Sequence, residues 1–211
     1  MCYHVINRGN DRADVFHKDG DFQAFVDLIG LCCQRLPLKV FAYCLMSNHF
    51  HLVLRPTNDG DLSRWMQWLM TSHVRRYHRH QHSSGHVWQG RFKAFPIQAD
   101  EHLLAVLRYV ERNPVRAEMV DRAEDWRWSS LRWWPSRARP AWLCDWPIDR
   151  PRNWKKRVNQ LETESELEVL RRSVNRGTPY GSGRWVTLTA TRLDLEFSIR
   201  PRGRPRKQAK K

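Results

Sequence analysis

The spacing of hydrophobic residues predicts an alternation of strands and helices over the first 120 residues. Residues 3–8 alternate in polarity as a β-strand does, and a Gly-Asn-Asp sequence follows them. Between residues 21 and 36 the apolar side chains recur at helical spacing. Residues 38–44 and 48–55 then predict two strands, and the very short turn between them predicts a hairpin.

One more strand and two more helices complete this pattern. A long amphipathic helix is predicted from Asp61 until the chain breaks at Gly85, and residues 90–98 predict a short strand. Asp100 is a candidate helix cap, and the helix after it carries apolar residues along one side as far as Val110. This order of elements predicts an α+β fold, in which helices pack on one face of a small antiparallel sheet.

The character of the chain changes after residue 125. Residues 126–154 are rich in Trp, Pro and Arg, which predicts an irregular segment that wraps around the rest. Thr163 and Glu166 have the spacing of a capping box, so we expect a helix there and a second short helix around 184–194. The last twelve residues are basic and nearly free of apolar side chains, which predicts disorder in the free protein. We therefore divide the chain into an α+β unit at 1–125, a mostly helical and irregular basic extension at 126–199, and a basic tail at 200–211.

The charge balance indicates a polyanionic partner. Lys and Arg total 37 against 22 acidic residues, which gives a formal net charge of +15. Nucleic acid is the first candidate partner for such a chain, and a membrane surface is the second. The sequence contains neither an apolar run of about 18 residues nor an apolar signal segment. We therefore expect a cytoplasmic protein that associates with the nucleoid and not with membranes.

The cysteines and tryptophans favour a reduced protein with an aromatic core. Five cysteines occur without C-x-x-C spacing, which argues against a disulfide framework and against a cysteine zinc site. Eleven tryptophans are many for this length, and we expect most of them in the core.

Two histidines interrupt the predicted strand at 48–55. His49, His51 and Val53 share one face of that strand, whereas Phe50 and its apolar neighbours share the other face, because strand side chains alternate with period two. A buried imidazole without a partner costs about 1–3 kcal/mol. A metal ion would satisfy both rings at once, and two structural histidines are the alternative interpretation.

A second group of polar side chains lies on the last predicted helix of the α+β unit. Tyr109 is offset from the inner face of that helix, and a tyrosine of the core is the usual explanation for such a position. Asn113 follows four residues later, on the same face if the helix continues. Asn113 also precedes Pro114, so it could instead cap a new helical turn.

Four sequence blocks carry a family resemblance. They are YHVINRGN at the start, LMSNHFHLVLRP around the histidines, HVWQGRFKAFPI leading into the last predicted strand and covering most of it, and LRYVERNPVRAEMV around the tyrosine. In this order they resemble the single-tyrosine transposases with an HUH motif, and more narrowly the REP-associated tyrosine transposases of bacteria. The similarity covers most of the chain, from Tyr3 to about Lys207, and is least diagnostic between 135 and 160.

This resemblance implies a fold, a reaction and a set of roles. The fold would be a sheet like that of RNA-recognition motifs. The H-x-H motif falls on His49 and His51, the nucleophile on Tyr109, and the third metal-ligand position on Asn113. The implied cofactor is a divalent metal, Mg²⁺ or Mn²⁺. The implied activity is a DNA endonuclease and transposase that cleaves single-stranded DNA beside REP-type hairpins through a 5′-phosphotyrosine and rejoins it.

Basic residues near these motifs are candidates for contacts with DNA phosphates. Five of them lie beside or within the core motifs, and three lie in the tail, where RGRP resembles an AT-hook. Each of these residues could also be an ordinary surface charge. The sequence leaves open whether the protein is a monomer or a homodimer. The candidates are Arg8, Arg12, Arg55, Arg91, Lys93, Arg202, Arg204 and Arg206.

Other interpretations stay open beside the transposase. The chain starts almost on its first strand, whereas family members usually carry a short basic leader, so either the leader is missing or translation starts upstream. A hairpin-DNA-binding regulator without cleavage activity is the first alternative function. A metal-dependent hydrolase that acts through water is the second, and it would form no covalent adduct with DNA.

Overall fold

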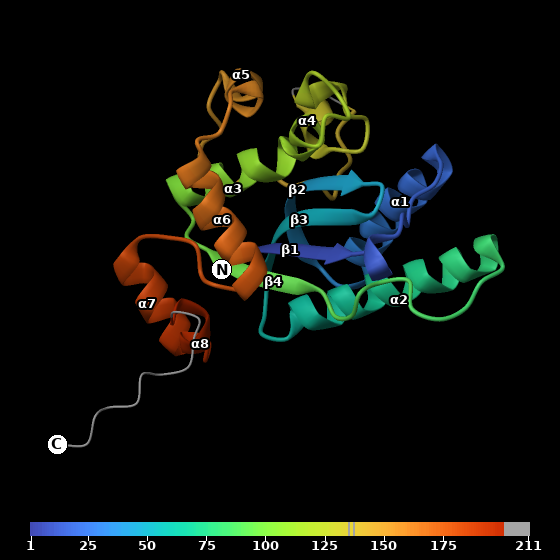
Figure 1. Ribbon diagram of the computed structural model, residues 1–211, viewed down its shortest axis with the longest axis horizontal. Coiled ribbons are helices and arrows are strands. Elements are labelled where there is room, and N and C mark those ends of the chain that lie inside the picture. Colours follow the sequence, from blue (N-terminus) through green and yellow to red (C-terminus); the bar gives the residue numbers. More distant parts are fainter. Residues whose placement is uncertain (135, 137, 201–211) are drawn as a thin grey trace.

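A four-stranded antiparallel sheet is the centre of the protein. The computed structural model describes residues 1–134, 136 and 138–200. The strands follow the spatial order β2-β3-β1-β4, and all neighbours are antiparallel (Figure 1). Their bounds are Cys2–Arg8 for β1, Leu38–Met46 for β2, His49–Pro56 for β3 and Lys93–Ile97 for β4.

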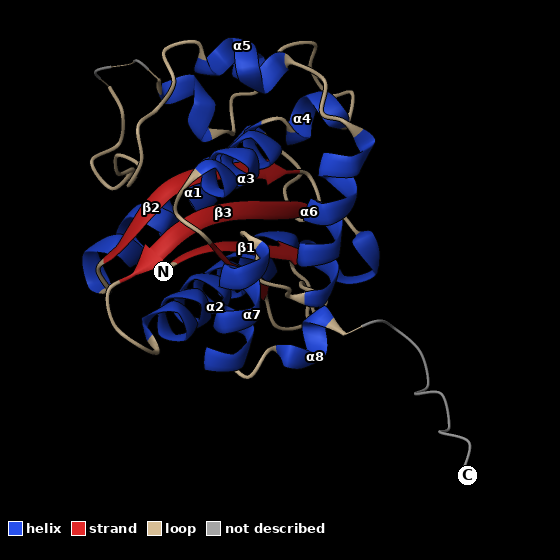
Figure 2. Ribbon diagram, turned by 90° about the vertical axis from the view of Figure 1, so that its left-hand side faces the viewer, coloured by secondary structure: helices blue, strands red, loops and turns tan. Residues whose placement is uncertain are grey.

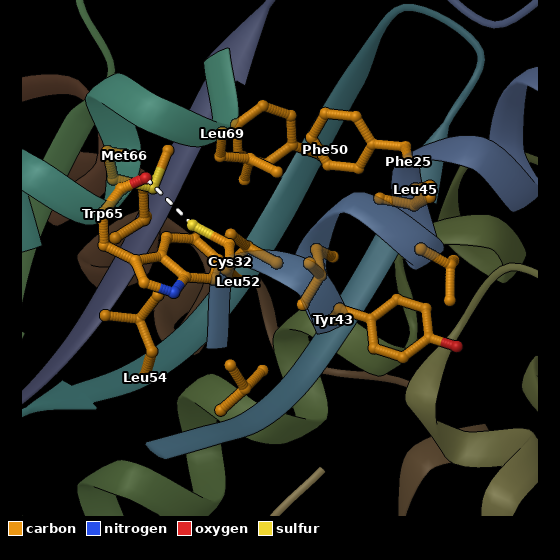
Figure 3. Close-up of a cluster of buried hydrophobic side chains, with 14 of the residues drawn as sticks. Phe25, Cys32, Tyr43, Leu45, Phe50, Leu52, Leu54, Trp65, Met66 and Leu69 are labelled. Atoms are coloured by element: carbon orange, nitrogen blue, oxygen red, sulfur yellow. Dashed lines mark hydrogen bonds between the residues drawn. The ribbon is translucent and has the colours of Figure 1, made fainter. Parts of the chain in front are cut away.

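Two long helices, α1 (Asp19–Arg35) and α2 (Asp61–Gln81), cover one face of the sheet. Phe50 on β3 is fully buried and packs in one hydrophobic cluster with Phe25 of α1 and Trp65 of α2 (Figure 3). The thiol of Cys32 on α1 donates a hydrogen bond to the carbonyl oxygen of Trp65 at 3.3 Å. The apolar face predicted for residues 50, 52 and 54 is therefore confirmed as a core face.

A third helix, α3 (Glu101–Glu111), covers the opposite face. Leu103, Leu107 and Val110 of α3 pack there in a second cluster with Val53 and Phe95 of the sheet. The α+β prediction is confirmed, but the expectation that helices lie on one face only was wrong, because helices surround the sheet (Figure 2). The physical reason is that both faces of the central strands carry apolar residues, and each face must be covered.

Short helices make up most of the remaining chain. Thr163 caps α6 with a capping box completed by Glu166, as predicted. α7 confirms the helix expected around 184–194, whereas the sequence pattern did not predict α5 or α8. The end of α7 lies beside the N-terminus (Figure 1), where Arg192 contacts Met1. The helices are α4 (Asn113–Arg116), α5 (Trp154–Asn159), α6 (Glu164–Arg176), α7 (Gly183–Arg192) and α8 (Glu196–Ile199), with 3₁₀ turns at Asn10–Arg12, Ala123–Asp125 and Ser130–Trp133.

The Trp- and Arg-rich segment lies along the edge strand β2. The backbone N–H of Leu45 donates to the carbonyl of Trp128 at 2.9 Å, and the indole N–H of Trp126 donates to the carbonyl of Leu45 at 2.8 Å. Farther along β2, the indole N–H of Trp146 donates to the carbonyl of Phe41 at 2.9 Å. These bonds satisfy backbone groups that an exposed edge strand would leave unpaired.

The other composition-based expectations have mixed outcomes. All five cysteines are free, and three of them are buried. Five of the tryptophans are buried, at positions 65, 88, 128, 146 and 154. Within the described residues, no helix combines the length and the apolar character needed to cross a membrane.

A buried carboxyl group holds α3 to the wrapping segment. Glu111 is fully buried at the end of α3, where it accepts hydrogen bonds from the hydroxyl of Ser130 and the indole N–H of Trp154, both at 2.7 Å. Burial raises the pKa of Glu111, and the charge of Arg150 opposes that increase. Because Glu111 accepts hydrogen bonds from two buried donors of a distant segment, it holds the C-terminal end of α3 against that segment.

Replacing Glu111 should therefore destabilise the protein. We expect Glu111→Ala to lower the free energy of unfolding by about 2–4 kcal/mol, because two buried donors lose their acceptor. Urea denaturation followed by tryptophan fluorescence measures this change. The matched control is Glu101→Ala, an exposed glutamate at the other end of the same helix, which should cost less than about 1 kcal/mol. Equal losses in the two variants would contradict the anchoring role.

Candidate active site

The register of the sheet places the two histidines of β3 on the face that α3 covers. His49 pairs with Arg8 of β1 and His51 pairs with Ile6, so these four side chains share one face. The two imidazole ring centroids are 5.0 Å apart. The prediction that His49 and His51 share a face with Val53 is confirmed, since Val53 packs in the α3 cluster.

A tight turn before β3 fixes the position of His49. The N–H of Gly9 donates to the carbonyl of Asn48 at 2.7 Å. A Cβ atom at Gly9 would lie 2.1 Å from the carbonyl oxygen of Ala13, so only glycine fits there. The side chain of Asn48 in turn lies 2.6 Å from Nδ1 of His49. This contact assigns the proton to Nδ1, because the amide oxygen of Asn48 can only accept, and it leaves Nε2 of His49 with a free lone pair.

Tyr109 reaches the same face from α3. Its ring centroid lies 5.9 Å from that of His51, with the two planes at 87°. The guanidinium carbon of Arg116 lies 4.2 Å from the centroid of the Tyr109 ring, which is cation–π geometry. Burial raises the pKa of Tyr109, and the positive charge of Arg116 opposes this increase. Tyr109 is therefore a buried phenol that faces an imidazole and lies beneath a cation.

Asn113 lies one turn after Tyr109, although α3 has ended. It is buried at the first position of α4, so the interpretation of Asn113 as the capping residue was wrong, and Arg112 holds that position. Its side-chain N–H donates to the carbonyl of Tyr109 at 3.0 Å. Its amide oxygen accepts a hydrogen bond from Arg116 at 2.8 Å. The amide oxygen of Asn113 thus has one of its two lone pairs already used.

One pocket of about 320 Å³ brings these side chains together. Three of its lining residues belong to α6, more than 50 positions after Tyr109 in the chain, and the sequence analysis missed them. No local pattern could have assigned them, because their relation to the pocket depends on the tertiary fold. The pocket is lined by Ile6, Arg8, Met46, His49, His51, Tyr109, Asn113, Arg116, Ala117, Arg171, Val174 and Asn175.

The donor atoms of this pocket fit a divalent cation. Nε2 of His51 is buried and has no hydrogen-bond partner among the described residues. Burial lowers the pKa of His49 to about 4 and that of His51 well below its usual value, so both rings are neutral near pH 7. Neutral imidazole nitrogens and an amide oxygen are ligands that Mn²⁺ accepts and that Mg²⁺ accepts in part.

The basic residues predicted to contact DNA fall into three groups. Arg8, Arg91 and Lys93 line a second pocket of about 310 Å³, which shares Ile6, Arg8, Val174 and Asn175 with the first. Arg12 lies in the 3₁₀ turn after β1, and Arg55 lies over the ring of Phe41, so neither lines the histidine pocket. Arg202, Arg204 and Arg206 lie outside the described residues.

One further cluster of possible metal ligands has a structural explanation. Asp100, Glu101 and His102 bring three ligand atoms within 4.8 Å of one another. The carboxylate of Asp100 accepts from the backbone N–H of His102 at 3.0 Å and caps α3. Its second contact, to Nδ1 of His102 at 2.8 Å, completes the cap.

Comparison with known proteins shows the class to which this site belongs. The family model described as "Transposase IS200 like" matches residues 1–113, which include His49, His51, Tyr109 and Asn113. The chain therefore belongs to the family of IS200-like transposases.

Two known proteins are similar to this chain. A protein of Haemophilus influenzae whose name assigns it to the REP-associated tyrosine transposases is 29% identical over 109 residues, which is 47% of this chain and 62% of the relative. A solved structure of a REP-associated tyrosine transposase bound to a REP hairpin superimposes with a TM-score of 0.55 and 19% identity, over 70% of this chain and 85% of that one. At this identity the second likeness establishes the fold. The resemblance inferred from the sequence blocks is confirmed.

Removing the charge of Arg116 should raise the pKa of Tyr109 further, because the guanidinium favours the phenolate. We expect a higher Tyr109 pKa in Arg116→Ala than in the wild type, and an intermediate value in Arg116→Lys, which keeps a positive charge. NMR titration of ¹³Cζ-labelled tyrosine in metal-free protein measures this value, with Tyr109→Phe to assign the signal. An unchanged or lower pKa in Arg116→Ala would show that Arg116 does not tune the phenol.

Proposed function

We propose that this protein is a metal-dependent transesterase that cleaves single-stranded DNA beside REP-type hairpins and rejoins it. The observation that carries the proposal is the convergence of His49, His51, Tyr109 and Asn113 on one pocket. Three separate elements of the fold supply these residues, so their meeting is not a consequence of sequence proximity. Buried polar groups of this kind contribute little to core stability unless they are paired, which favours a chemical role.

Tyr109 is the proposed nucleophile. Its phenolic oxygen forms a bond to the scissile phosphorus while the bond from phosphorus to the 3′-oxygen breaks. The phenol loses a proton and the leaving 3′-oxygen gains one. The products are a 5′-phosphotyrosine and a free 3′-hydroxyl, and the reverse reaction with another 3′-hydroxyl rejoins the strand. Arg116, which lies over the ring, lowers the cost of the phenolate that this attack requires.

His49, His51 and Asn113 are the residues proposed to hold the cofactor. Mg²⁺ or Mn²⁺, when bound, would polarise the scissile phosphate and offset charge that develops in the transition state. Asn48 orients His49 through Nδ1, so that Nε2 points its lone pair away from the turn. Arg116 orients Asn113 in the same way.

The basic pocket next to the histidines is the proposed path for the DNA strand. Arg8, Arg91 and Lys93 supply positive charge there, and Asn7, Gln89 and Asn175 supply polar groups. Arg12, Arg55 and the tail residues stay candidates for contacts with hairpin DNA farther from the pocket. The net charge of +15 supports a nucleic-acid partner in the cytoplasm, in association with the nucleoid.

The same geometry suggests a role for each of the three segments of the chain. We propose that residues 1–125 form the catalytic unit and that residues 126–199 support it, because α6 lines both pockets. The tail at 200–211 is proposed to tether DNA. Since one chain supplies the histidines, the tyrosine and the amide, a monomer carries a complete site.

Replacing the proposed nucleophile should abolish the covalent product and little else. Tyr109→Phe keeps the ring and its packing, so we expect normal folding and hairpin binding but no protein–DNA adduct. A denaturing gel with 5′- and 3′-labelled hairpin-flanked strands and Mn²⁺ detects the adduct. Tyr180→Phe, which removes a tyrosine hydroxyl that does not line the histidine pocket, is the matched control and should keep the adduct.

The same gel separates the alternative functions. An adduct that persists in Tyr109→Phe, or that maps to another tyrosine, would contradict the assignment of the nucleophile. Cleavage without any adduct in the wild type would favour a hydrolase that acts through water. Binding without cleavage or adduct would favour the hairpin-binding regulator.

Removing the proposed ligands should separate cleavage from binding. We expect His49→Ala and the His49→Ala, His51→Ala double variant to lose at least about 100-fold in cleavage rate and to keep hairpin affinity within a few-fold. His80→Ala, at an exposed histidine on α2, is the matched control and should cleave normally. Single-turnover cleavage and gel-shift titration measure the two quantities. Unchanged cleavage by the double variant would rule out the metal site.

A further inference from the structure

A third histidine lies next to the pair, and the sequence blocks gave it no role. His4 is on β1, is fully buried, and pairs with Val53 of β3 in the sheet register. Its side chain therefore shares the face of His51, on the diagonal between the two strands, where long side chains reach each other. The two ring centroids are 5.0 Å apart, and Phe95 packs against His4 from the other side at 4.9 Å. His4 does not line the pocket, so it has no direct access to substrate.

A single hydrogen bond joins His4 to His51. Nε2 of His4 lies 2.8 Å from Nδ1 of His51. The outer nitrogens, Nδ1 of His4 and Nε2 of His51, are buried and have no partner within the described residues. A neutral imidazole carries one ring proton, so the neutral pair shares two ring protons.

Two arrangements of these protons satisfy the bond. In one, His4 donates from Nε2, and the outer nitrogen of His51 carries a proton. In the other, His51 donates from Nδ1, and its outer Nε2 presents a lone pair to the pocket. A cation can bind only the second arrangement, because a protonated nitrogen has no lone pair to give. The two arrangements have the same charge, so the choice between them needs no net gain or loss of protons.

We propose that His4 is a positioning residue that accepts the Nδ1 proton of His51 and thereby aims the Nε2 lone pair of His51 at the metal pocket. This inference rests on the proposed function, since it gives His51 its role as a ligand. A metal-binding histidine usually donates its other ring N–H to an acceptor, which fixes its tautomer and ring orientation. His4 supplies that acceptor from a neighbouring strand.

A purely structural role explains the geometry less well. An apolar ring would fill the same space between Val53 and Phe95 without a desolvation cost. The His4–His51 pair instead leaves two buried nitrogens without a partner among the described residues, each at a cost of about 1–3 kcal/mol. Because this histidine pair lowers stability and lies beside the proposed active site, an effect on that site explains it better.

Metal affinity in two variants tests the proposal. His4→Phe keeps a ring but removes the acceptor, and His4→Gln keeps an amide oxygen near the position of Nε2. We expect His4→Phe to raise the Kd for Mn²⁺ by about 10–100-fold, and His4→Gln to stay within a few-fold of the wild type. Electron paramagnetic resonance of free Mn²⁺ in a titration of full-length protein measures the Kd without DNA or turnover.

A second buried histidine provides the matched control. His73 on α2 is 3% exposed, and its Nδ1 also has no partner in the part of the chain that the structure describes. It packs against Phe25, on the opposite face of the sheet. His73→Phe should leave the Kd for Mn²⁺ unchanged. An equal loss of affinity in His73→Phe and His4→Phe would show that replacing any buried histidine weakens Mn²⁺ binding by destabilising the protein. This result would overturn the proposal.

The tautomer of His51 gives a readout that does not depend on the variants folding. We expect long-range ¹H–¹⁵N NMR spectra of the wild type with saturating Mg²⁺ to show His51 protonated at Nδ1 and His4 accepting at Nε2. Protonation of His51 at Nε2 under these conditions would overturn the proposal. A second result would also overturn the proposal: the wild type and His4→Phe bind Mn²⁺ equally well, while His49→Ala does not bind it. This result would leave the proposed function intact. Failure of the wild type to bind Mn²⁺ would overturn both.

Discussion

The packing of α3 across the second face of the sheet is the constraint on which the site depends. Three apolar residues of α3 bury themselves against the strands, and Glu111 holds the end of the helix from behind. Tyr109 lies between these contacts, so its position is set by the core and not by a mobile loop. The same packing buries the imidazole of His51, so its ring nitrogens need partners other than bulk water. Sites held on rigid elements in this way keep their geometry with little reorganisation.

Arg116 links the structure of the site to its electrostatics. Its guanidinium contacts the ring of Tyr109, the amide oxygen of Asn113 and the carboxylate of Glu162, the last at 2.8 Å. Glu162 lies just before α6, and only 5% of its side chain is exposed. A charge-assisted bond of this kind fixes the cation better than a surface pair does. The region after the α+β unit therefore holds in place the charge that acts on the phenol.

Local patterns predicted which side chains of the candidate site lie on one face. The period of two in β3 assigned His49 and His51 to one face, and the four-residue spacing brought Asn113 near Tyr109 even though a new helix begins between them. The same patterns could not predict that helices cover both faces, because an apolar face shows that something covers it but not what does. His4 was missed because one histidine in a strand carries no spacing signal. The α6 residues were missed because only the tertiary fold brings them to the pocket.

Because α6 lines the pocket, the wall of the pocket and its candidate reactive groups come from different parts of the chain. The imidazoles, the phenol and the amide lie within residues 1–113, where the family similarity is found, whereas Arg171, Val174 and Asn175 approach the same pocket from a helix outside that range. Substitutions in this helix would alter the wall of the pocket while the proposed catalytic groups stay as they are. What the pocket admits could therefore change without any change in the side chains proposed to react.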